Sequence, residues 1–156
     1  TPSRTEARLN AHDLRNEDMN IAWHQGHIRK GHASNGYWEV MVEQPGRYTF
    51  ELRRWPREAG HDIRAGIDGD DVEFRRECIT PESHSWYTGG TALDINTACL
   101  KITGQPMLSC PVNDNEDTAV FTVELPAGPT HVQTWFTDNK SLFLSAYYVS
   151  VSRMSE

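Results

Sequence analysis

The chain has 156 residues, of which 37% are hydrophobic and 24% charged, and this is typical of one globular domain rather than two. Its formal net charge of -7 disfavours nucleic acid and anionic membranes as partners, because both are bound mainly through basic patches. No apolar run approaches the about 20 residues of a membrane-spanning helix, and the opening TPSRTEARLN lacks the apolar core of a signal peptide.

The first half of the chain predicts a polar lead-in followed by a β-hairpin. Residues 1–30 show neither helical nor strand periodicity, so we expect a lead-in or linker packed on the domain, with at most a short edge strand. Apolar and polar residues then alternate over 38–42 and again over 48–52. Between these stretches, Pro45 and Gly46 occupy the positions that a type II turn favours.

The remainder of the chain predicts further short strands separated by turn-rich segments. The strand candidates are IRAGI, VEFRRECI, LDINTACLKI, TAVFTVEL, THVQTWFT and AYYVSVSR. No stretch shows four turns of helical period. Eight or nine strands at roughly 10-residue spacing predict an all-β fold, an antiparallel β-sandwich of jelly-roll (galactose-binding-like) type over residues 31–156.

The segment YTFELRRWPRE combines a strand with a cluster of arginines around a tryptophan. By strict alternation Arg54 falls on the apolar face of the strand, whereas Arg53 and Trp55 fall on the face expected to be wet. An unpaired buried charge is costly, so we expect the Arg54 guanidinium to reach backbone carbonyls or a carboxylate. Glu58 and Asp62 are the nearest carboxylates in sequence.

Several aromatic and basic side chains are candidates for glycan recognition. An indole can stack on a sugar ring, and a guanidinium can recognise sulfate through planar multi-donor contacts. The candidate ligand-binding residues are Arg53, Trp55, Arg57, Trp86, Tyr87 and Trp135. The alternative for each tryptophan is burial at an end of the sandwich, and the alternative for the arginines is a packing role at a domain or subunit boundary.

The sequence carries no recognisable catalytic signature, and we predict no catalytic residue. It lacks a G-x-S-x-G elbow, an H-E-x-x-H pair and a phosphate-binding loop. His24, His27 and His32 lie close together in a predicted loop, but no cysteine or carboxylate completes a zinc ligand set. Solvent-facing or capping histidines are the simpler interpretation.

Two acidic clusters could hold a structural calcium ion, since calcium binds several hard oxygen ligands from a turn. One consists of Asp68, Asp70 and Asp71, and the other lies within residues 113–117. Neither has the spacing of an EF-hand loop, and a solvated hairpin turn is the simpler explanation of each. No other cofactor is predicted.

Three cysteines, Cys78, Cys99 and Cys110, cannot all pair within one chain. Cys99 and Cys110 are close enough in sequence to bridge a loop, so a disulfide between them is one prediction. Three buried thiols are the alternative.

Two long stretches of the chain resemble a known family region. Residues 23–60 contain a G-x-W-x-V-x-V strand, a Gly-x-Tyr turn and the ending L-R-R-W-P-x-E, and the last strand is of the A-Y-Y-V-x-V type. This pattern resembles the all-β region that follows the catalytic domain in bacterial arylsulfatase-like proteins. The matching positions are Gly36, Trp38, Gly46, Tyr48, Leu52, Arg53, Arg54, Trp55, Pro56, Glu58, Ala146, Tyr147, Tyr148 and Val149.

The resemblance implies a non-catalytic accessory domain, structural or glycan-orienting, joined in cis to a sulfatase catalytic domain in a secreted, periplasmic or extracellular protein. It does not carry over catalysis, because sulfatases of this type use a C/S-x-P-x-R motif. Here SCPVN has Asn113 in place of the arginine, and TPSR matches only the end of the motif. A free-standing carbohydrate-binding module, or an extracellular structural or interaction domain, is the alternative.

Overall fold

The structure is a computed structural model that describes residues 6–16, 28, 31, 33, 36–68, 72–74, 85–87 and 90–155. Within this part of the chain, the regular structure is mostly strand, with two 3₁₀ helices, η1 (Ala11–Asp13) and η2 (Arg57–Ala59). No helix that the structure describes is long and apolar enough to cross a membrane.

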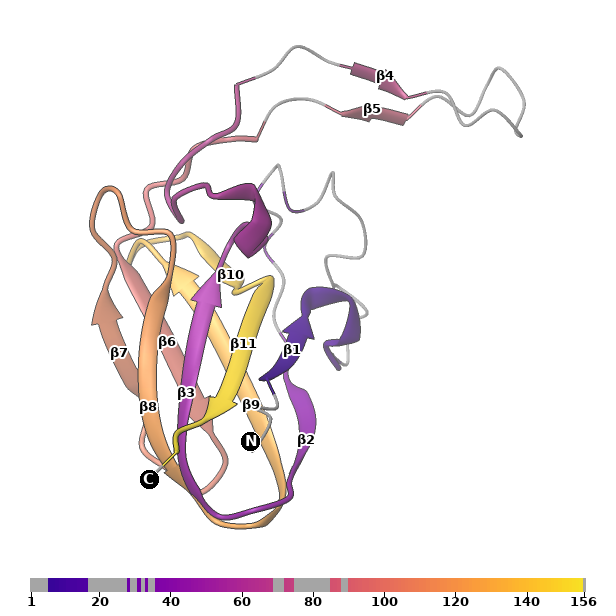
Figure 1. The fold of residues 1–156 in the computed structure, drawn as a ribbon. Coiled ribbons are helices and arrows are strands. Elements are labelled where there is room, and N and C mark those ends of the chain that lie inside the picture. Colours follow the sequence, from indigo (N-terminus) through magenta and orange to yellow (C-terminus); the bar gives the residue numbers. More distant parts are fainter. Residues whose placement is uncertain are drawn as a thin grey trace.

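Two antiparallel sheets face each other and form a sandwich (Figure 1). The four-stranded sheet has the order β1 (Glu6–Asn10), β11 (Tyr148–Arg153), β3 (Gly46–Arg53) and β8 (Ala119–Leu125). The five-stranded sheet has the order β10 (Phe143–Ser145), β9 (Gly128–Thr137), β6 (Thr97–Ile102) and β7 (Leu108–Pro111), and β2 (Trp38–Val42) also pairs with β9. The predicted all-β sandwich of jelly-roll type is therefore confirmed.

Alternation of apolar and polar residues decides which face of each strand enters the core. Along β8 the burial pattern is strictly alternating, with Phe121 6% exposed and its neighbour Val120 52% exposed. From the opposite sheet, Val132 and Phe136 on β9 enter the same core and are 1% and 0% exposed. The sandwich is thus held by the inner faces of the two sheets, as the period of two predicts.

The polar lead-in supplies an edge strand, β1, which pairs with β11. Two hydrogen bonds fasten its end to the rest of the sandwich. The Trp38 indole donates to the Asn10 carbonyl at 2.9 Å, and the Ala11 amide donates to the Tyr147 carbonyl at 2.8 Å. Because Trp38 belongs to the five-stranded sheet, these contacts tie the two sheets together at β1.

A third, two-stranded sheet consists of β4 (Val72–Phe74) and β5 (Ser85–Tyr87), and Figure 1 shows it extending beyond the sandwich. At its base, Ile67 and Gly90 form an isolated bridge. The predicted strand IRAGI is wrong, because only this bridge forms there. The Ile63 amide instead donates to the Glu116 carbonyl at 2.8 Å, so this stretch packs as a loop against another loop.

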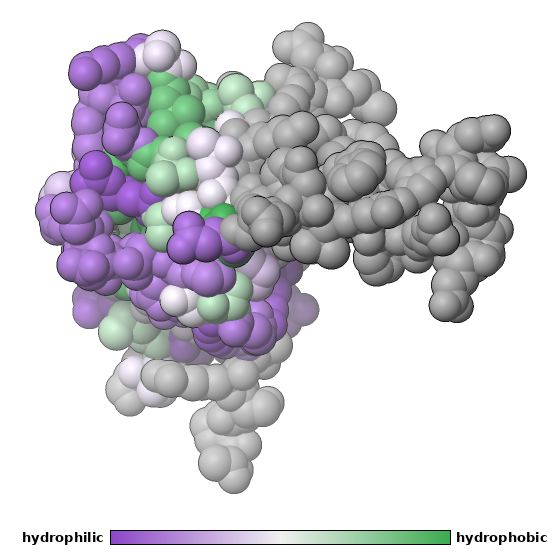
Figure 2. All heavy atoms as spheres, turned by 90° about the horizontal axis from the view of Figure 1, so that it is seen from above, coloured by the Kyte–Doolittle hydropathy of each residue, from purple (hydrophilic) through white to green (hydrophobic). Residues whose placement is uncertain are grey.

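The surface at one end of the sandwich is mostly polar. Figure 2 looks down on the end of the sandwich at which η2 lies, and most of the described surface there is hydrophilic, crossed by a hydrophobic band.

Two neighbouring residues of β8 give a matched test of the sandwich. Phe121→Ala should lower the free energy of unfolding by about 3–5 kcal/mol, because it removes a buried aromatic ring from the core. Val120→Ala should change it by about 0.5 kcal/mol or less, because that side chain faces solvent. Urea unfolding of both variants checks this, and equal losses at the two positions would contradict the assigned strand faces.

Candidate functional site

Arg54 is a buried arginine that follows β3 and binds two backbone carbonyls. Its side chain is 0% exposed, and its guanidinium donates to the Ala65 carbonyl at 3.0 Å and to the Thr91 carbonyl at 2.5 Å. The expectation that Arg54 reaches backbone carbonyls is confirmed, and the described contacts of its guanidinium do not involve Glu58 or Asp62. Burial lowers the pKa of Arg54 to about 10, so the guanidinium remains charged at neutral pH.

Trp55 is buried rather than wet, which corrects the expectation from strict alternation. It is 2% exposed, and its indole donates to the Ala65 carbonyl at 3.2 Å. The Arg54 guanidinium lies 4.5 Å from the ring centroid. A Cβ placed on Gly90 would lie 2.5 Å from the ring, so only glycine fits there. Trp55 is therefore a packing residue and offers no face to a sugar.

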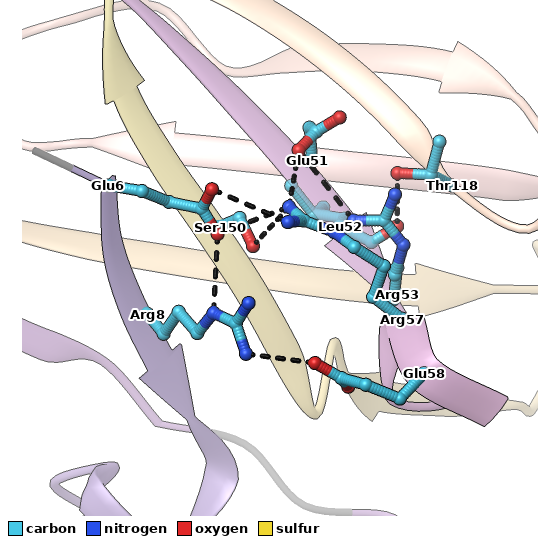
Figure 3. A network of polar contacts seen from close by, with 9 residues as sticks. All are labelled: Glu6, Arg8, Glu51, Leu52, Arg53, Arg57, Glu58, Thr118 and Ser150. Atoms are coloured by element: carbon cyan, nitrogen blue, oxygen red, sulfur yellow. Dashed lines mark hydrogen bonds and ion pairs between the residues drawn. The ribbon is translucent and has the colours of Figure 1, made fainter. Parts of the chain in front are cut away.

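Arg53 and Arg57 belong to a network of paired charges on the outer face of the four-stranded sheet (Figure 3). Arg57 lies 3.0 Å from Glu51 and 3.2 Å from Glu6, and Arg53 lies 3.7 Å from Glu51. The network also contains Arg8, which lies 3.0 Å from Glu58. Three arginines thus face three glutamates, and this supports the packing interpretation of both predicted ligand-binding arginines over sulfate recognition.

The arginines of this network lower the pKa values of their carboxylate partners. Hydrogen bonding to the Arg57 guanidinium is the main cause for Glu6. For Glu58 the main cause is a hydrogen bond to its own backbone amide, followed by a hydrogen bond from Arg8. The pair of Arg8 and Glu58 is mostly exposed, so it contributes little to stability. Arg53, expected on the wet face, is instead buried at 8% exposure.

Trp135 is the predicted ligand-binding tryptophan whose side chain lies on an outer face. Its neighbours Thr134 and Phe136 on β9 are both 0% exposed and enter the core, so Trp135 points to the outside of the five-stranded sheet, where it is half-buried. Phe143 from β10 stacks against it, with ring centroids 5.7 Å apart and an angle of 26° between the planes. Cys99 lies opposite Trp135 on β6.

A second pair of rings lies further along the same strand. His131 stacks on Tyr37, with centroids 4.6 Å apart and an angle of 23°. His131 and Trp135 are four positions apart on the extended strand, a span of about 13 Å. Glu39 lies opposite His131 and pairs with Arg15 at 2.7 Å. We call the four side chains Phe143, Trp135, Tyr37 and His131 the ring row.

Polar side chains border the ring row at the Phe143 end. The Asn139 amide donates to Asn96 Oδ1 and to Thr97 Oγ1, both at 2.8 Å. Thr97 lies in the same cross-strand row as Phe143. Asp138 accepts two backbone N–H groups of its own turn at 2.8 and 3.0 Å, and these hydrogen bonds lower the pKa of its carboxyl group. The turn beside the rings is therefore held in one conformation.

Sequence reasoning missed three members of the ring row, Tyr37, His131 and Phe143. The signal was present in THVQTWFT, where alternation places His131 on the same face as Trp135. The partner rings come from β10 and from the residue before β2, and the pairing of these segments with β9 is not visible in the local pattern.

The predicted disulfide between Cys99 and Cys110 is wrong, because both are free thiols. Cys99 lies opposite Ser109 and Cys110 lies opposite Ala98 in the register of β6 and β7. The two thiols therefore point to opposite faces of the sheet. Burial raises the pKa of both. Cys78 lies outside the described residues.

The other predicted sites lie partly or wholly outside the described part of the chain. His24, His27, His32, Asp70 and Asp71 are not among the described residues, and Trp86 and Tyr87 are described only as backbone of β5, with no account of their side chains.

The calcium prediction stays a prediction, although the described portions of the two clusters are accounted for by simpler contacts. Asp68 is exposed, and Glu116 accepts the Asn113 amide at 3.0 Å, as a capped turn does. Among the residues that the structure places, no group of three or more His, Cys, Asp and Glu side chains is arranged to hold a metal ion.

Comparison with known proteins gives weak structural likenesses only. No family model matches the sequence, and no curated protein matches it. A family 35 module (CBM35) of Abf62 from Cellvibrio japonicus has a TM-score of 0.44 at 13% identity, over 94% of this chain and 92% of that one.

Two further solved structures are similar to this chain at the same level. A GH26-CBM35 β-(1,4)-mannanase from Podospora anserina has a TM-score of 0.46 at 7% identity, over 97% of this chain and 28% of that one. A family 35 carbohydrate-binding module from Clostridium thermocellum has a TM-score of 0.40 at 11% identity, over 94% and 97%. Likenesses this weak carry no argument about function.

Burial of Trp55 generates a stability prediction. Trp55→Ala should lower the free energy of unfolding by about 3–5 kcal/mol, because it empties the site between Arg54 and the chain at Gly90. Arg57→Ala, two residues on but in the exposed network, should cost about 1 kcal/mol or less. Chemical denaturation measures both. A loss below about 1 kcal/mol for Trp55→Ala would contradict the packing role.

The charge network generates a prediction about titration. Arg57→Gln should raise the pKa of Glu6 towards its ordinary value, because the main hydrogen bond that favours the carboxylate is lost. Arg8→Gln should raise the pKa of Glu58 less, because the hydrogen bond to its own backbone amide, the main cause of its shift, remains. Carboxyl carbon NMR shifts followed against pH measure both. An unchanged Glu6 midpoint in Arg57→Gln would show that the pair does not persist in solution.

Proposed function

We propose that this domain is a non-catalytic carbohydrate-binding module that holds a glycan against the ring row. One observation carries the proposal: two stacked ring pairs, each with one ring on β9, lie on the outer face of the five-stranded sheet, with hydrogen-bonding side chains beside them. The apolar C–H face of a sugar packs well on an aromatic ring, while its hydroxyl groups need polar partners at the edge of that ring. Trp135 is the central contact in this arrangement.

The ring row is suited to binding because its members are already positioned. Phe143 supports Trp135 on one side, and Tyr37 supports His131. Rings held by such contacts lose little conformational freedom when a ligand binds, so more of the contact energy appears as affinity. The polar cluster around Asn139 and Thr97 supplies hydrogen-bonding groups at one end.

The wider context remains a second proposal, that the module accompanies a sulfatase catalytic domain in a periplasmic or extracellular protein. The segment LRRWPRE and the surrounding pattern, which resemble the accessory region of arylsulfatase-like proteins, favour it. The sequence of the same gene before Thr1 tests this proposal, since a C/S-x-P-x-R motif is required there. A different catalytic domain at that place would overturn the sulfatase context and leave the binding proposal intact.

Trp135→Ala should abolish retention on immobilised polysaccharides, because it removes the central stacking surface of the ring row. The free energy of unfolding should fall by about 2 kcal/mol or less, since the side chain is only half-buried on an outer face. Affinity gel electrophoresis in polysaccharide-containing gels measures retention, and urea unfolding measures stability.

Arg57→Gln is the matched control, because it changes a ligand-binding candidate on the outer face of the other sheet. It should leave retention unchanged. Loss of retention in Arg57→Gln but not in Trp135→Ala would place the glycan on the arginine network and overturn the proposed site.

A further inference from the structure

We infer that the ring row selects uncharged, extended glycans and discriminates against sulfated or uronic ones. This inference rests on the proposed binding function and names the class of ligand that the same surface accepts. It follows from the state of the cations that the structure describes, because a polyanionic glycan needs basic groups with donors to spare.

Every arginine that the structure describes has a partner within the chain. Arg8, Arg15, Arg47, Arg53, Arg57 and Arg64 each lie 2.7 to 3.7 Å from a carboxylate. Arg54 and Arg153 donate to backbone carbonyls instead. A sulfate or carboxylate group on a ligand would have to compete with these partners for the guanidinium, so the described arginines offer a polyanion less than unpaired cations would.

Two described cations on the side of the five-stranded sheet that carries the ring row are also engaged. Arg15 is held by Glu39, the residue opposite His131, at 2.7 Å. Lys101, on the same sheet face as Trp135, donates its ammonium group to the carbonyls of Gln105 and Ile102. Glu39 therefore places a negative charge beside one ring pair, with its counter-ion already bound.

The turn at Asp138, which borders the ring row, also carries Lys140. The structure gives no hydrogen bond for the side chain of Lys140. Its ammonium group is a minor cause of the lowered pKa of Asp138, after the backbone hydrogen bonds, so a ligand meets this cation beside an anion. With a formal net charge of -7 on the whole chain, the long-range field also repels polyanions. A ligand that stacks on the rings without bringing charge meets none of these costs.

The length of the ring row indicates an extended ligand. His131 and Trp135 are four residues apart on β9, about 13 Å in an extended strand. A single sugar unit covers one ring pair, whereas a linear oligosaccharide reaches both. Affinity should therefore rise with chain length from a monosaccharide to a longer linear oligosaccharide.

Two matched polysaccharide pairs test the inference on the intact domain. The probes are κ-carrageenan with its desulfated form, and polygalacturonate with its methyl ester, so that each pair shares a sugar backbone and differs in its charged group. We expect the wild-type domain to bind at least one neutral member about tenfold more tightly than its charged counterpart, with a Kd that changes by less than about twofold between about 0.05 M and about 0.5 M NaCl.

Glu39→Gln gives the complementary result. It releases Arg15 and removes the anion beside His131, so binding of the charged members should strengthen and become salt-dependent. No gain in this variant would overturn the role assigned to Glu39 in the discrimination.

The outcomes distinguish failure of the charge discrimination from failure of the binding function itself. Tight, salt-dependent binding of a charged member by the wild-type domain, lost in Trp135→Ala, would overturn the inference and leave the proposed function standing. Retention of none of the polysaccharides, or retention that Trp135→Ala does not affect, would overturn the proposed function and the inference together.

Discussion

The structure depends on one constraint, the burial of the Arg54 guanidinium at the end of an apolar strand face. A charge in that position needs hydrogen-bond acceptors that do not move, and the carbonyls of Ala65 and Thr91 supply them. These two carbonyls lie just outside the bridge between Ile67 and Gly90, from which the chain leaves to form β4 and β5. The same contacts that satisfy the charge therefore fix the base of the projecting two-stranded sheet and cover Trp55.

The two outer faces of the sandwich differ in how their polar groups are used. On the four-stranded sheet, Arg53 and Arg57 are paired with Glu6 and Glu51, so charges on that face balance within the chain. On the five-stranded sheet, rings interrupt the polar pattern and stand half-exposed. A surface whose polar groups are already satisfied has little to offer a ligand, whereas exposed rings do, and this asymmetry is the reason to look for binding beside β9.

Strand periodicity was sufficient to predict the sandwich, because alternating segments identify strands that bury one face. It also placed Arg54 on the apolar side, and the residue is buried. It placed Trp55 in water, since alternation assumes that the strand continues, whereas β3 ends at Arg53 and a later loop covers the indole. The disulfide between Cys99 and Cys110 was predicted from their closeness along the chain. Separation along the chain says nothing about register, and the register of β6 with β7 puts the two thiols on opposite faces.

The ring row illustrates the same limit in a functional setting. The sequence singles out Trp135, but a lone half-buried indole on a sheet is a weak basis for a binding site. Trp135 differs from such a lone indole because Phe143 stacks against it. Phe143 lies there because β10 pairs with β9 in the register that places Leu144 opposite Phe136. Recognition on this face thus depends on strand pairing as much as on residue type. Since the pairing is set by burial of Leu144 and Phe136 in the core, the packing that stabilises the sandwich also positions the rings on its outside.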